Sequence, residues 1–374
     1  MPQVSDFTPL KVLGTGSFGK VVLVKNKVTG KLYAQKQLRK DTMKDKDYLN
    51  TINERTILAK ISHPNVVKLH YALQDFNKVY LILEYLSGGE LFYHLRQEHI
   101  LSEDIAAFYA AQMILAIRHL HLDANVIYRD LKPENCLLNE SGHLVLTDFG
   151  LSAIYQDFCS SKDGTAQYMA PEVIKSEKYD GKCDWWSLGA VLFDLITGNP
   201  PFTGNNNKRI MEKIISKKIS WPIYMSQFAR QFLQKLLNKN ADKRLNLDDN
   251  AAFESIKSDP FFRKIDWVAI ESQRCVPPIR PVIVDPESAE NFDDEFTSME
   301  ITPPNSPISK VLYDEIQESR SNSTSSIIKI KRNDNSGELK ESVYFTDFSF
   351  SRDSFLDSHL LSLENSITSL SLND

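Results

Sequence analysis

The hydrophobic and polar positions of the first 86 residues predict a small sheet with one main helix. Short apolar, β-branched runs at Lys20–Val24 and Val79–Leu83 are typical of strands. Between them, from Tyr48 to Ile61, the apolar residues recur with a helical period. We therefore expect residues 7–86 to form a β-rich unit that carries a single helix.

The pattern changes after Gly89 and predicts a larger, mainly helical unit. Apolar residues recur at helical spacing in three segments, Asp104–His121, Trp185–Thr197 and Phe228–Leu237. Prolines at positions 277, 278 and 281 would break any further helix, so the chain is predicted to leave its compact body there. These segments together indicate an α+β fold, with a β-rich part followed by a helical part.

Composition adds an asymmetry of charge along the chain. With 42% hydrophobic residues, the 374-residue chain can bury a substantial core. Residues 285–374 contain 18 acidic and 7 basic residues, net −11, and because the whole chain carries −5, the first 284 residues carry +6. The same stretch holds 19 serines, a composition that predicts a largely disordered, modifiable tail.

Several classes of protein are disfavoured by these features. The lysines form no basic run interleaved with aromatic residues, so we expect no nucleic-acid partner. No stretch of 18 or more residues is free of charge and no apolar leader follows a charged start, so we expect no membrane span. The four cysteines lack Cys-x-x-Cys spacing and are expected to be reduced thiols. We expect a soluble monomer located in the cytoplasm, with the nucleus as an additional location left open.

A glycine-rich string, Gly14-Thr-Gly16-Ser-Phe-Gly19-Lys-Val21, lies near the start of the chain. Glycines at this spacing let backbone amides approach a phosphate chain closely. The string alone is a weak signal, because hairpins and dinucleotide-binding loops share it. Here it precedes a β-rich run instead of opening a helix, which favours a flap over a nucleotide.

Lys36 and Glu54 supply a candidate ion pair beside this flap. Lys36 follows on the predicted third strand, from which its ammonium can reach the α- and β-phosphates if a carboxylate holds it. Glu54 lies on the predicted helix and is the candidate carboxylate. The alternative is two unrelated surface charges, since each residue type is common on surfaces.

Residues 126–135 supply three parts of a phosphate-transfer site. In this segment Asp130 can orient the hydroxyl proton of an acceptor, Lys132 can face the γ-phosphate and Asn135 can ligate Mg²⁺. Thirteen residues after Asn135 comes Asp148-Phe-Gly, whose carboxylate is an oxygen ligand of the kind that Mg²⁺ prefers.

With these motifs in order, residues 7–262 resemble the eukaryotic protein kinases. The remaining motifs of the family are Ala170-Pro171-Glu172, Asp184-Trp185-Trp186-Ser187-Leu188-Gly189 and Arg244. The resemblance implies a bilobal fold, with a small lobe at 7–86, a hinge at 84–88, a large lobe at 89–262, and ATP with Mg²⁺ between the lobes. It also implies a buried, structural ion pair of Glu172 with Arg244, and an Asp184 that braces the catalytic loop.

The same resemblance implies the ATP-binding residues. Val21, Ala34 and Leu137 are expected to sandwich the adenine, the backbone of 84–86 to hydrogen-bond it, and Leu83 to be the gatekeeper. The full expected set is Leu13, Gly14, Gly16, Gly19, Val21, Ala34, Lys36, Glu54, Leu83, Glu84, Leu86, Glu90 and Leu137.

Two features resemble the AGC group of kinases, which act on serine or threonine near basic residues. Tyr128 replaces the usual histidine, and the tail at 263–350 contains a segment at 291–297 that is similar to the group's active-site-crossing segment. The tail also contains a turn motif at 302–307 and a hydrophobic motif at 345–350, before a disordered extension at 351–374. Lys132 together with Thr165 favours serine or threonine acceptors over tyrosine.

Within the group, segments 81–92 and 185–202 are most similar to ribosomal protein S6 kinases. A protein kinase B relative is the alternative, but the short segment before the sheet leaves no room for a lipid-binding domain. The length likewise favours the type with a single kinase domain. A nucleotide-binding scaffold is the second hypothesis, although no motif of the catalytic set is missing.

The resemblance also implies substrate-binding and regulatory residues. Glu90, Glu134 and Asp194 should form an acidic rim that favours arginine or lysine before the acceptor, and Thr165 should also bind substrate. The expected phosphosites are Ser161, Thr302, Ser306 and Ser349. Ser160 competes with Ser161, because Ser161-Lys-Asp-Gly-Thr165 departs from the family's Thr-Phe-Cys-Gly-Thr.

The resemblance further implies that two upstream enzymes and one docking event regulate the protein. A phosphoinositide-dependent kinase is expected to act on Ser161, and a TOR-type kinase on Ser306 and Ser349. The three phenylalanines of the hydrophobic motif have no local core, so we expect them to dock beside the helix that carries Glu54.

Overall fold

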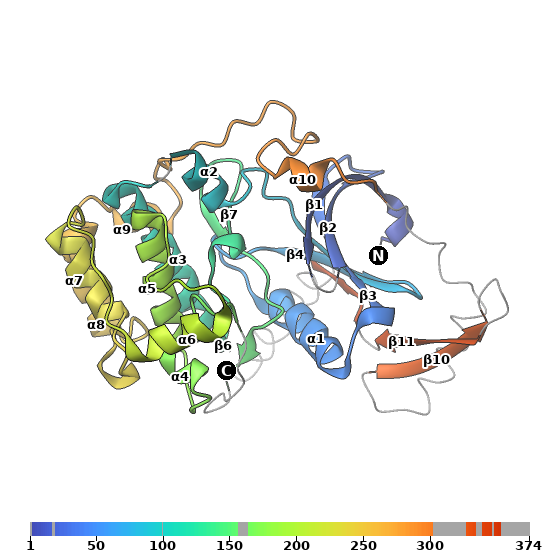
Figure 1. Ribbon diagram of the computed structural model, residues 1–374. Helices are drawn as coiled ribbons and strands as arrows, with labels where there is room; N and C mark the ends of the chain where they lie inside the picture. Colours follow the sequence, from blue (N-terminus) through green and yellow to red (C-terminus); the bar gives the residue numbers. More distant parts are fainter. Residues whose placement is uncertain are drawn as a thin grey trace, which may run out of the picture.

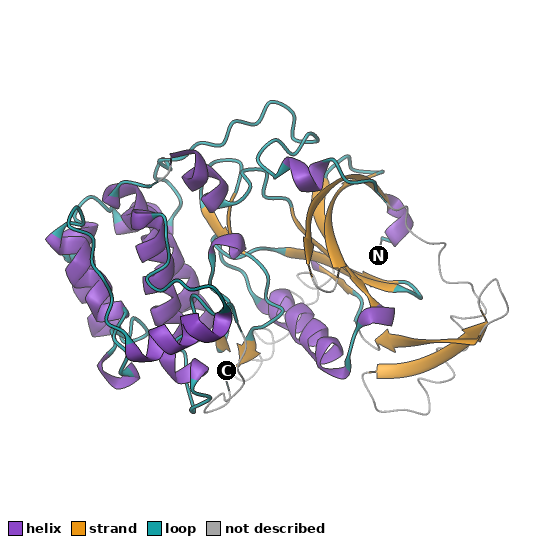
Figure 2. Cartoon of the chain, in the orientation of Figure 1, coloured by secondary structure: helices purple, strands orange, loops and turns teal. Residues whose placement is uncertain are grey.

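Two lobes lie side by side in the computed structural model of the chain (Figure 1). The structure describes residues 2–16, 19–98, 100–155, 164–301, 327–333, 339–345 and 348–352. Strands gather in one lobe and helices in the other, and a long loop of the tail runs back from the helical lobe to the sheet (Figure 2). The α+β, two-lobed prediction is confirmed.

The small lobe is built on an antiparallel sheet with strand order β1-β2-β3-β5-β4-β12. Its strands are β1 (Phe7–Gly16), β2 (Gly19–Asn26), β3 (Leu32–Arg39), β4 (Leu69–Gln74), β5 (Lys78–Glu84) and, from the tail, β12 (Phe350–Ser351). The 3-10 turns η1 (Val4–Asp6) and η2 (Lys40–Thr42) precede β1 and follow β3. Helix α1 (Asp45–Lys60) is the single main helix of this lobe.

The large lobe packs its helices around α3 and α5, which are buried along most of their length. Its helices are α2 (Leu91–Glu98), α3 (Glu103–Leu122), α4 (Pro171–Ile174), α5 (Lys182–Thr197), α6 (Asn207–Ser216), α7 (Gln227–Leu236), α8 (Asn250–Lys257) and α9 (Trp267–Glu271). Short elements complete it: β6 (Val126–Ile127), η3 (Pro133–Asn135), β7 (Cys136–Leu138), β8 (Leu144–Leu146), β9 (Ala153–Ile154), η4 (Ala241–Lys243) and η5 (Pro260–Phe262).

Helix ends follow the local sequence. The hydroxyls of Ser102 and Ser226 accept hydrogen bonds from the backbone N–H groups of Ile105 and Ala229, so each serine caps the first turn of its helix. Helix α5 ends at Gly198, whose φ of 73° suits glycine. These signals explain why the predicted helical segments agree with α1, α3, α5 and α7 to within a few residues.

Helix α3 is strongly apolar because most of its surface is buried in the large lobe. Among the described residues it is the one helix with the length and hydropathy of a membrane span, yet 67% of its most apolar window is buried inside the lobe. Packing against α5 and α9 therefore uses this apolar surface.

Several segments of the tail form regular structure. Residues 264–301 continue from the large lobe and include α10 (Asp294–Thr297), which lies against β1 (Figure 1). Further on, β10 (Ile327–Asn333) and β11 (Leu339–Phe345) form an antiparallel hairpin. Within the tail, these segments are the ones in which β-branched and aromatic residues locally outweigh serine and acid.

Candidate active site

A cleft of about 530 Å³ lies between the lobes, and residues of both lobes line it. All thirteen side chains or glycines predicted to bind ATP line this one cleft. So do Asp130, Lys132, Asn135 and Asp148 from the large lobe. Residues that are distant in the sequence are thus brought to a single space of the size that a small-molecule site needs.

The glycine string connects β1 to β2, as the strand–loop–strand prediction required. A Cβ atom at Gly14 or Gly16 would meet no other atom within 4 Å, so these glycines leave open space for a ligand. At Gly19, by contrast, a Cβ would lie 1.7 Å from the carbonyl oxygen of Gln37. Gly14 and Gly16 therefore allow a ligand to approach the backbone closely, whereas Gly19 allows β2 to pack closely against β3.

Lys36 joins the two lobes through carboxylates. Its Nζ lies 2.7 and 2.9 Å from the two carboxylate oxygens of Glu54 and 2.8 Å from Oδ1 of Asp148. Burial opposes the charge of Lys36, but the two facing carboxylates outweigh it and hold its pKa above the usual value. The predicted ion pair of Lys36 with Glu54 is confirmed, and it anchors α1 to the sheet.

Asp130 is held by three neighbours. Lys132 Nζ donates to its Oδ2 at 2.7 Å, and Asn135 Nδ2 donates to its backbone carbonyl at 2.8 Å. The hydroxyl of Thr165 lies 3.4 Å from Oδ1. Burial raises the pKa of Asp130, while Lys132 works against this shift. The carboxylate is therefore fixed in direction and is placed to accept a proton.

Asn135 and Asp148 fit a divalent metal bound together with phosphates. Because Lys36 faces it, the pKa of Asp148 is lowered to about 2, so its carboxylate is ionised near neutral pH. Asn135 uses its amide nitrogen on Asp130, which leaves its oxygen available as a ligand. Among the described residues no group of three or more metal-ligand side chains occurs. Two oxygen ligands suit an ion that takes its other ligands from substrate phosphates and water.

Two non-glycine residues with positive φ flank this machinery. Arg129 has a φ of 67° and Asp148 a φ of 57°, a region that L-residues occupy at a cost. Asp184 holds the first of them, since its two carboxylate oxygens accept the backbone N–H groups of Tyr128 and Arg129 at 2.8 Å each. The predicted bracing role of Asp184 is confirmed.

The family model for the protein kinase domain matches residues 7–262. The chain belongs to the protein kinase domain family. Kinases of this family use ATP with a divalent metal, and the cleft described above holds the residues for both. The metal would neutralise charge on the phosphates, held there by Asn135 and Asp148.

The named relatives indicate to which group of kinases the chain is similar. It is 42% identical over 363 residues to serine/threonine-protein kinase YPK3 of Saccharomyces cerevisiae, covering 79% of this chain and 69% of that protein. It is 45% identical over 314 residues to ribosomal protein S6 kinase 2 beta of Xenopus laevis and to human ribosomal protein S6 kinase alpha-1. These matches cover 81% of this chain but 48% and 42% of the relatives, so the kinase spans less than half of their length. The similarity to AGC kinases of the S6 type is thus confirmed.

The predicted acidic rim is only partly at the cleft. Glu90 and Glu134 line the cleft, and Arg96 lies 3.3 Å from the carboxylate of Glu90. Asp194 differs from the prediction, because it is buried in α5 and accepts a hydrogen bond from the hydroxyl of Tyr168 at 2.8 Å. Burial raises the pKa of Asp194 to about 6. Asp194 is buried, and is not at the rim of the cleft, because α5 is packed in the core of the large lobe.

Phe292 and Thr147 are among the cleft residues that sequence reasoning about ATP missed. Phe292 of the tail lines the cleft and stacks on Tyr85 of the hinge, with ring centroids 6.0 Å apart. Thr147, directly before Asp148, lines it too. The aromatic residue in an acidic tail segment was the available signal for Phe292, whereas Thr147 carries none beyond its position next to the motif.

The hydrophobic motif lies against α1. Phe345, Phe348 and Phe350 are buried, and the carbonyl oxygens of Phe348 and Ser349 accept hydrogen bonds from the guanidinium of Arg55 at 3.1 and 3.2 Å. Ser349 itself is exposed. The structure therefore places the phenylalanines where docking was expected, beside the helix that carries Glu54.

Arg352 extends this docking beyond the motif. Its guanidinium donates to the backbone carbonyls of Leu69 at 2.8 Å, of Leu58 at 3.1 Å and of Ile61 at 3.2 Å. Two of these carbonyls belong to the end of α1, where a cation is favourable. The other expected phosphosites, Ser161, Thr302 and Ser306, and the competitor Ser160 lie outside the described residues.

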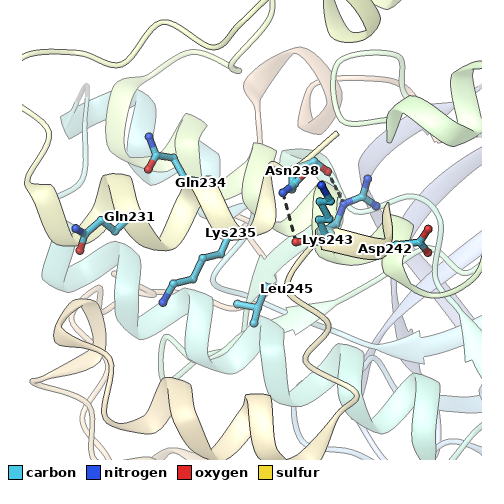
Figure 3. Close-up of a pocket in the computed structure, with 8 residues that line it drawn as sticks. Gln231, Gln234, Lys235, Asn238, Asp242, Lys243 and Leu245 are labelled. Atoms are coloured by element: carbon cyan, nitrogen blue, oxygen red, sulfur yellow. Dashed lines mark hydrogen bonds between the residues drawn. The ribbon is translucent and has the colours of Figure 1, made fainter. Parts of the chain in front are cut away.

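A second hollow of about 540 Å³ lies on the large lobe, between α7 and η4 (Figure 3). Its polar lining includes Gln231, Gln234, Lys235 and Lys243, and Asn238 is tied there to the backbone of Lys243. None of the residues of the phosphate-transfer set lines it. The chemistry therefore assigns the reaction to the cleft between the lobes.

Proposed function

We propose that this kinase transfers the γ-phosphate of Mg²⁺-bound ATP to serine or threonine hydroxyls of proteins that carry basic residues before the acceptor. The observation that carries the proposal is the convergence on Asp130 of Lys132, Asn135 and Thr165. Asp130 orients the acceptor hydroxyl and takes its proton, while Lys132 faces the transferred phosphate. Transfer breaks the bond between the β-bridging oxygen and the γ-phosphorus, forms the bond from the acceptor oxygen, and leaves ADP.

The preference for basic substrates rests on Glu90 and Glu134 at the cleft. Glu134 is exposed and not tied to a described cation, so it can pair with an arginine of a substrate. Such charges attract basic partners and fix their register, although a solvated pair alone contributes little.

Replacing Glu134 by alanine is expected to lower the preference for arginine before the acceptor by about two- to fivefold, the effect of one solvent-exposed ion pair. The measurement is kcat/KM for two serine peptides that differ only in arginine or alanine at the positions before serine. Glu140→Ala serves as control, because Glu140 is an exposed carboxylate outside the cleft. An unchanged arginine preference in Glu134→Ala would contradict the rim, whereas inactivity of the unaltered chain on all peptides would contradict phosphate transfer itself.

Control by the tail is the second part of the proposal. Phe348 packs 5.4 Å from Phe345, which in turn contacts Tyr48 of α1 at 5.6 Å between ring centroids. A docked tail thus supports the helix that holds Glu54 against Lys36. Phosphorylation of Ser349 and Ser306 by a TOR-type kinase and of Ser161 by a phosphoinositide-dependent kinase would set how much of the population is docked.

Replacing Phe348 by alanine is expected to lower kcat by about tenfold, within the usual range of coupling between sites. The reason is that the tail then loses a buried anchor and holds α1 less firmly. Steady-state kinetics of the full chain measure the effect. Val284→Ala, an exposed tail residue, should leave kcat unchanged. Equal kcat in Phe348→Ala and the unaltered chain would argue against tail control, and full activity after complete dephosphorylation would remove the phosphate switch.

A further inference from the structure

His121, in the last turn of α3, lies between two carboxylates outside the cleft. Its Nε2 is 2.8 Å from Oδ2 of Asp184, and its Nδ1 is 2.9 Å from Oδ1 of Asp248. The side chain is only 6% exposed. Since a carboxylate can only accept, both ring nitrogens donate, which is the arrangement of a protonated imidazole.

The first carboxylate is the one that holds the catalytic loop. Asp184 accepts the N–H of Tyr128 on the same Oδ2 that faces His121, and the N–H of Arg129 on Oδ1. Asp130 follows Arg129 directly. The position of the catalytic carboxylate therefore depends on a group whose other face is fixed by His121.

The second carboxylate comes from residues 246–250, the end of the loop that follows η4 together with the first residue of α8. Arg118, one turn before His121, donates to the carbonyl of Leu247 and, at 2.8 Å, to the side-chain oxygen of Asn250. Trp185 donates from its indole to Oδ2 of Asp248 at 3.3 Å. This segment is thus pinned to both α3 and α5, and Asp248 has a defined direction.

The ring of His121 has little freedom to leave this position. A Cβ atom on Gly181 would lie 2.9 Å from its Cε1, so the backbone before α5 closes one side of the ring. Trp185 packs edge-on against it, with ring centroids 5.5 Å apart. The imidazole therefore connects Asp248 to Asp184 with fixed geometry.

We propose that Asp248 is a positioning residue for phosphate transfer, which acts through His121 and Asp184 on the backbone of the catalytic loop. This inference rests on the proposed function and adds to it a residue that touches neither ATP nor acceptor. The chain of contacts runs from the segment at 246–250 to the amide next to Asp130 without an intervening gap.

The charges around His121 make the role sensitive to pH. Burial disfavours the protonated ring, but its hydrogen bonds to Asp184 and Asp248 outweigh this and raise the pKa of His121 to about 9. Arg118 on the same helix is the nearby cation, and burial raises the pKa of the Cys183 thiol beside Asp184 so that it stays neutral. The pKa of His121 in the folded protein is thus higher than its ordinary value of 6.5. Protonation of His121 therefore stabilises the folded protein fully below pH 6.5, and this stabilisation is lost as the pH rises through about 9.

Asp248→Asn tests the inference, because asparagine keeps the shape and one acceptor oxygen, for either His121 or Trp185, but removes the charge. We expect the alkaline limb of kcat to move down by about one pH unit, with about a threefold loss of kcat at pH 8.5 and an unchanged KM for ATP. The pKa of His121, read from its imidazole NMR signals in the full chain, should fall in parallel. Asp249→Asn is the matched control: it is the neighbouring residue, undergoes the same change of charge and caps only α8.

Three outcomes separate the possibilities. A lowered His121 pKa with an unchanged pH profile of kcat would overturn the positioning role. A loss of kcat that is equal at every pH and in both variants would also overturn it, because it would show only a structural effect. Absence of phosphate transfer by the unaltered chain, with His121 still titrating near pH 9, would overturn the proposed function on which the inference rests.

Discussion

Asp130→Asn is expected to lower kcat by about 10² to 10⁴, the range for loss of a positioned proton acceptor. Asparagine can keep the contact with Asn135 and the backbone, but its amide cannot take the proton of the acceptor hydroxyl. The side chain is 4% exposed, so solvent does not replace it. Phosphate incorporation into a basic serine peptide measures the effect, and calorimetric titration with ATP should show nearly unchanged binding.

The matched control for this experiment is Asp242→Asn. Asp242 is 91% exposed on the large lobe and lies outside the cleft between the lobes, so the same change of charge should leave kcat as it was. If Asp130→Asn retained full incorporation, Asp130 would have no enzymatic role, and a nucleotide-binding scaffold would become the better account of the chain.

Arg244→Ala is expected to destabilise the kinase by about 3 to 5 kcal/mol, the cost of leaving a buried carboxylate without its partner. Arg244 is fully buried and donates to both oxygens of Glu172, at 2.6 and 2.9 Å. It also donates to the carbonyl of Lys182 at 2.8 Å. The measurement is the urea midpoint and slope of unfolding for each variant.

Two further variants provide comparisons for Arg244→Ala. Arg244→Lys keeps the charge but loses the two-pronged geometry, so it should fall between the alanine variant and the unaltered chain. Lys257→Ala removes a pair with Glu254 on the surface of α8 and should cost no more than about 1 kcal/mol. A loss below about 1 kcal/mol in Arg244→Ala would mean that the predicted structural pair contributes little.

Much of the fold and of the cleft follows from local signals in the sequence. The helices were predictable because buried positions recur with the period of a helix and serine or glycine marks their ends, as at Ser102 and Gly198. The catalytic set was predictable because Asp130, Lys132 and Asn135 lie within six residues of one another. Short spacing fixes their relative positions before tertiary structure is considered.

Contacts between distant segments were not predictable in this way. Asp194 matches a rim position by resemblance, yet its burial depends on Tyr168, which lies 26 residues away and packs over α5. His121 and Asp248 are 127 residues apart, and each alone has the appearance of an ordinary helix or loop residue. The hairpin of β10 and β11 was not predicted, because the average composition of the whole tail does not reveal two short strands within it.

The tail also determines which strand borders the solvent in the small lobe. Phe350 pairs with Ala72 and Ser351 with Tyr71, so β12 covers a strand that would otherwise be outermost in the sheet. An uncovered outer strand offers its free N–H and C=O groups to strands of other chains. Release of the tail would therefore do more than loosen α1: it would give the kinase a self-association surface, so that the docked state favours solubility as well as catalysis.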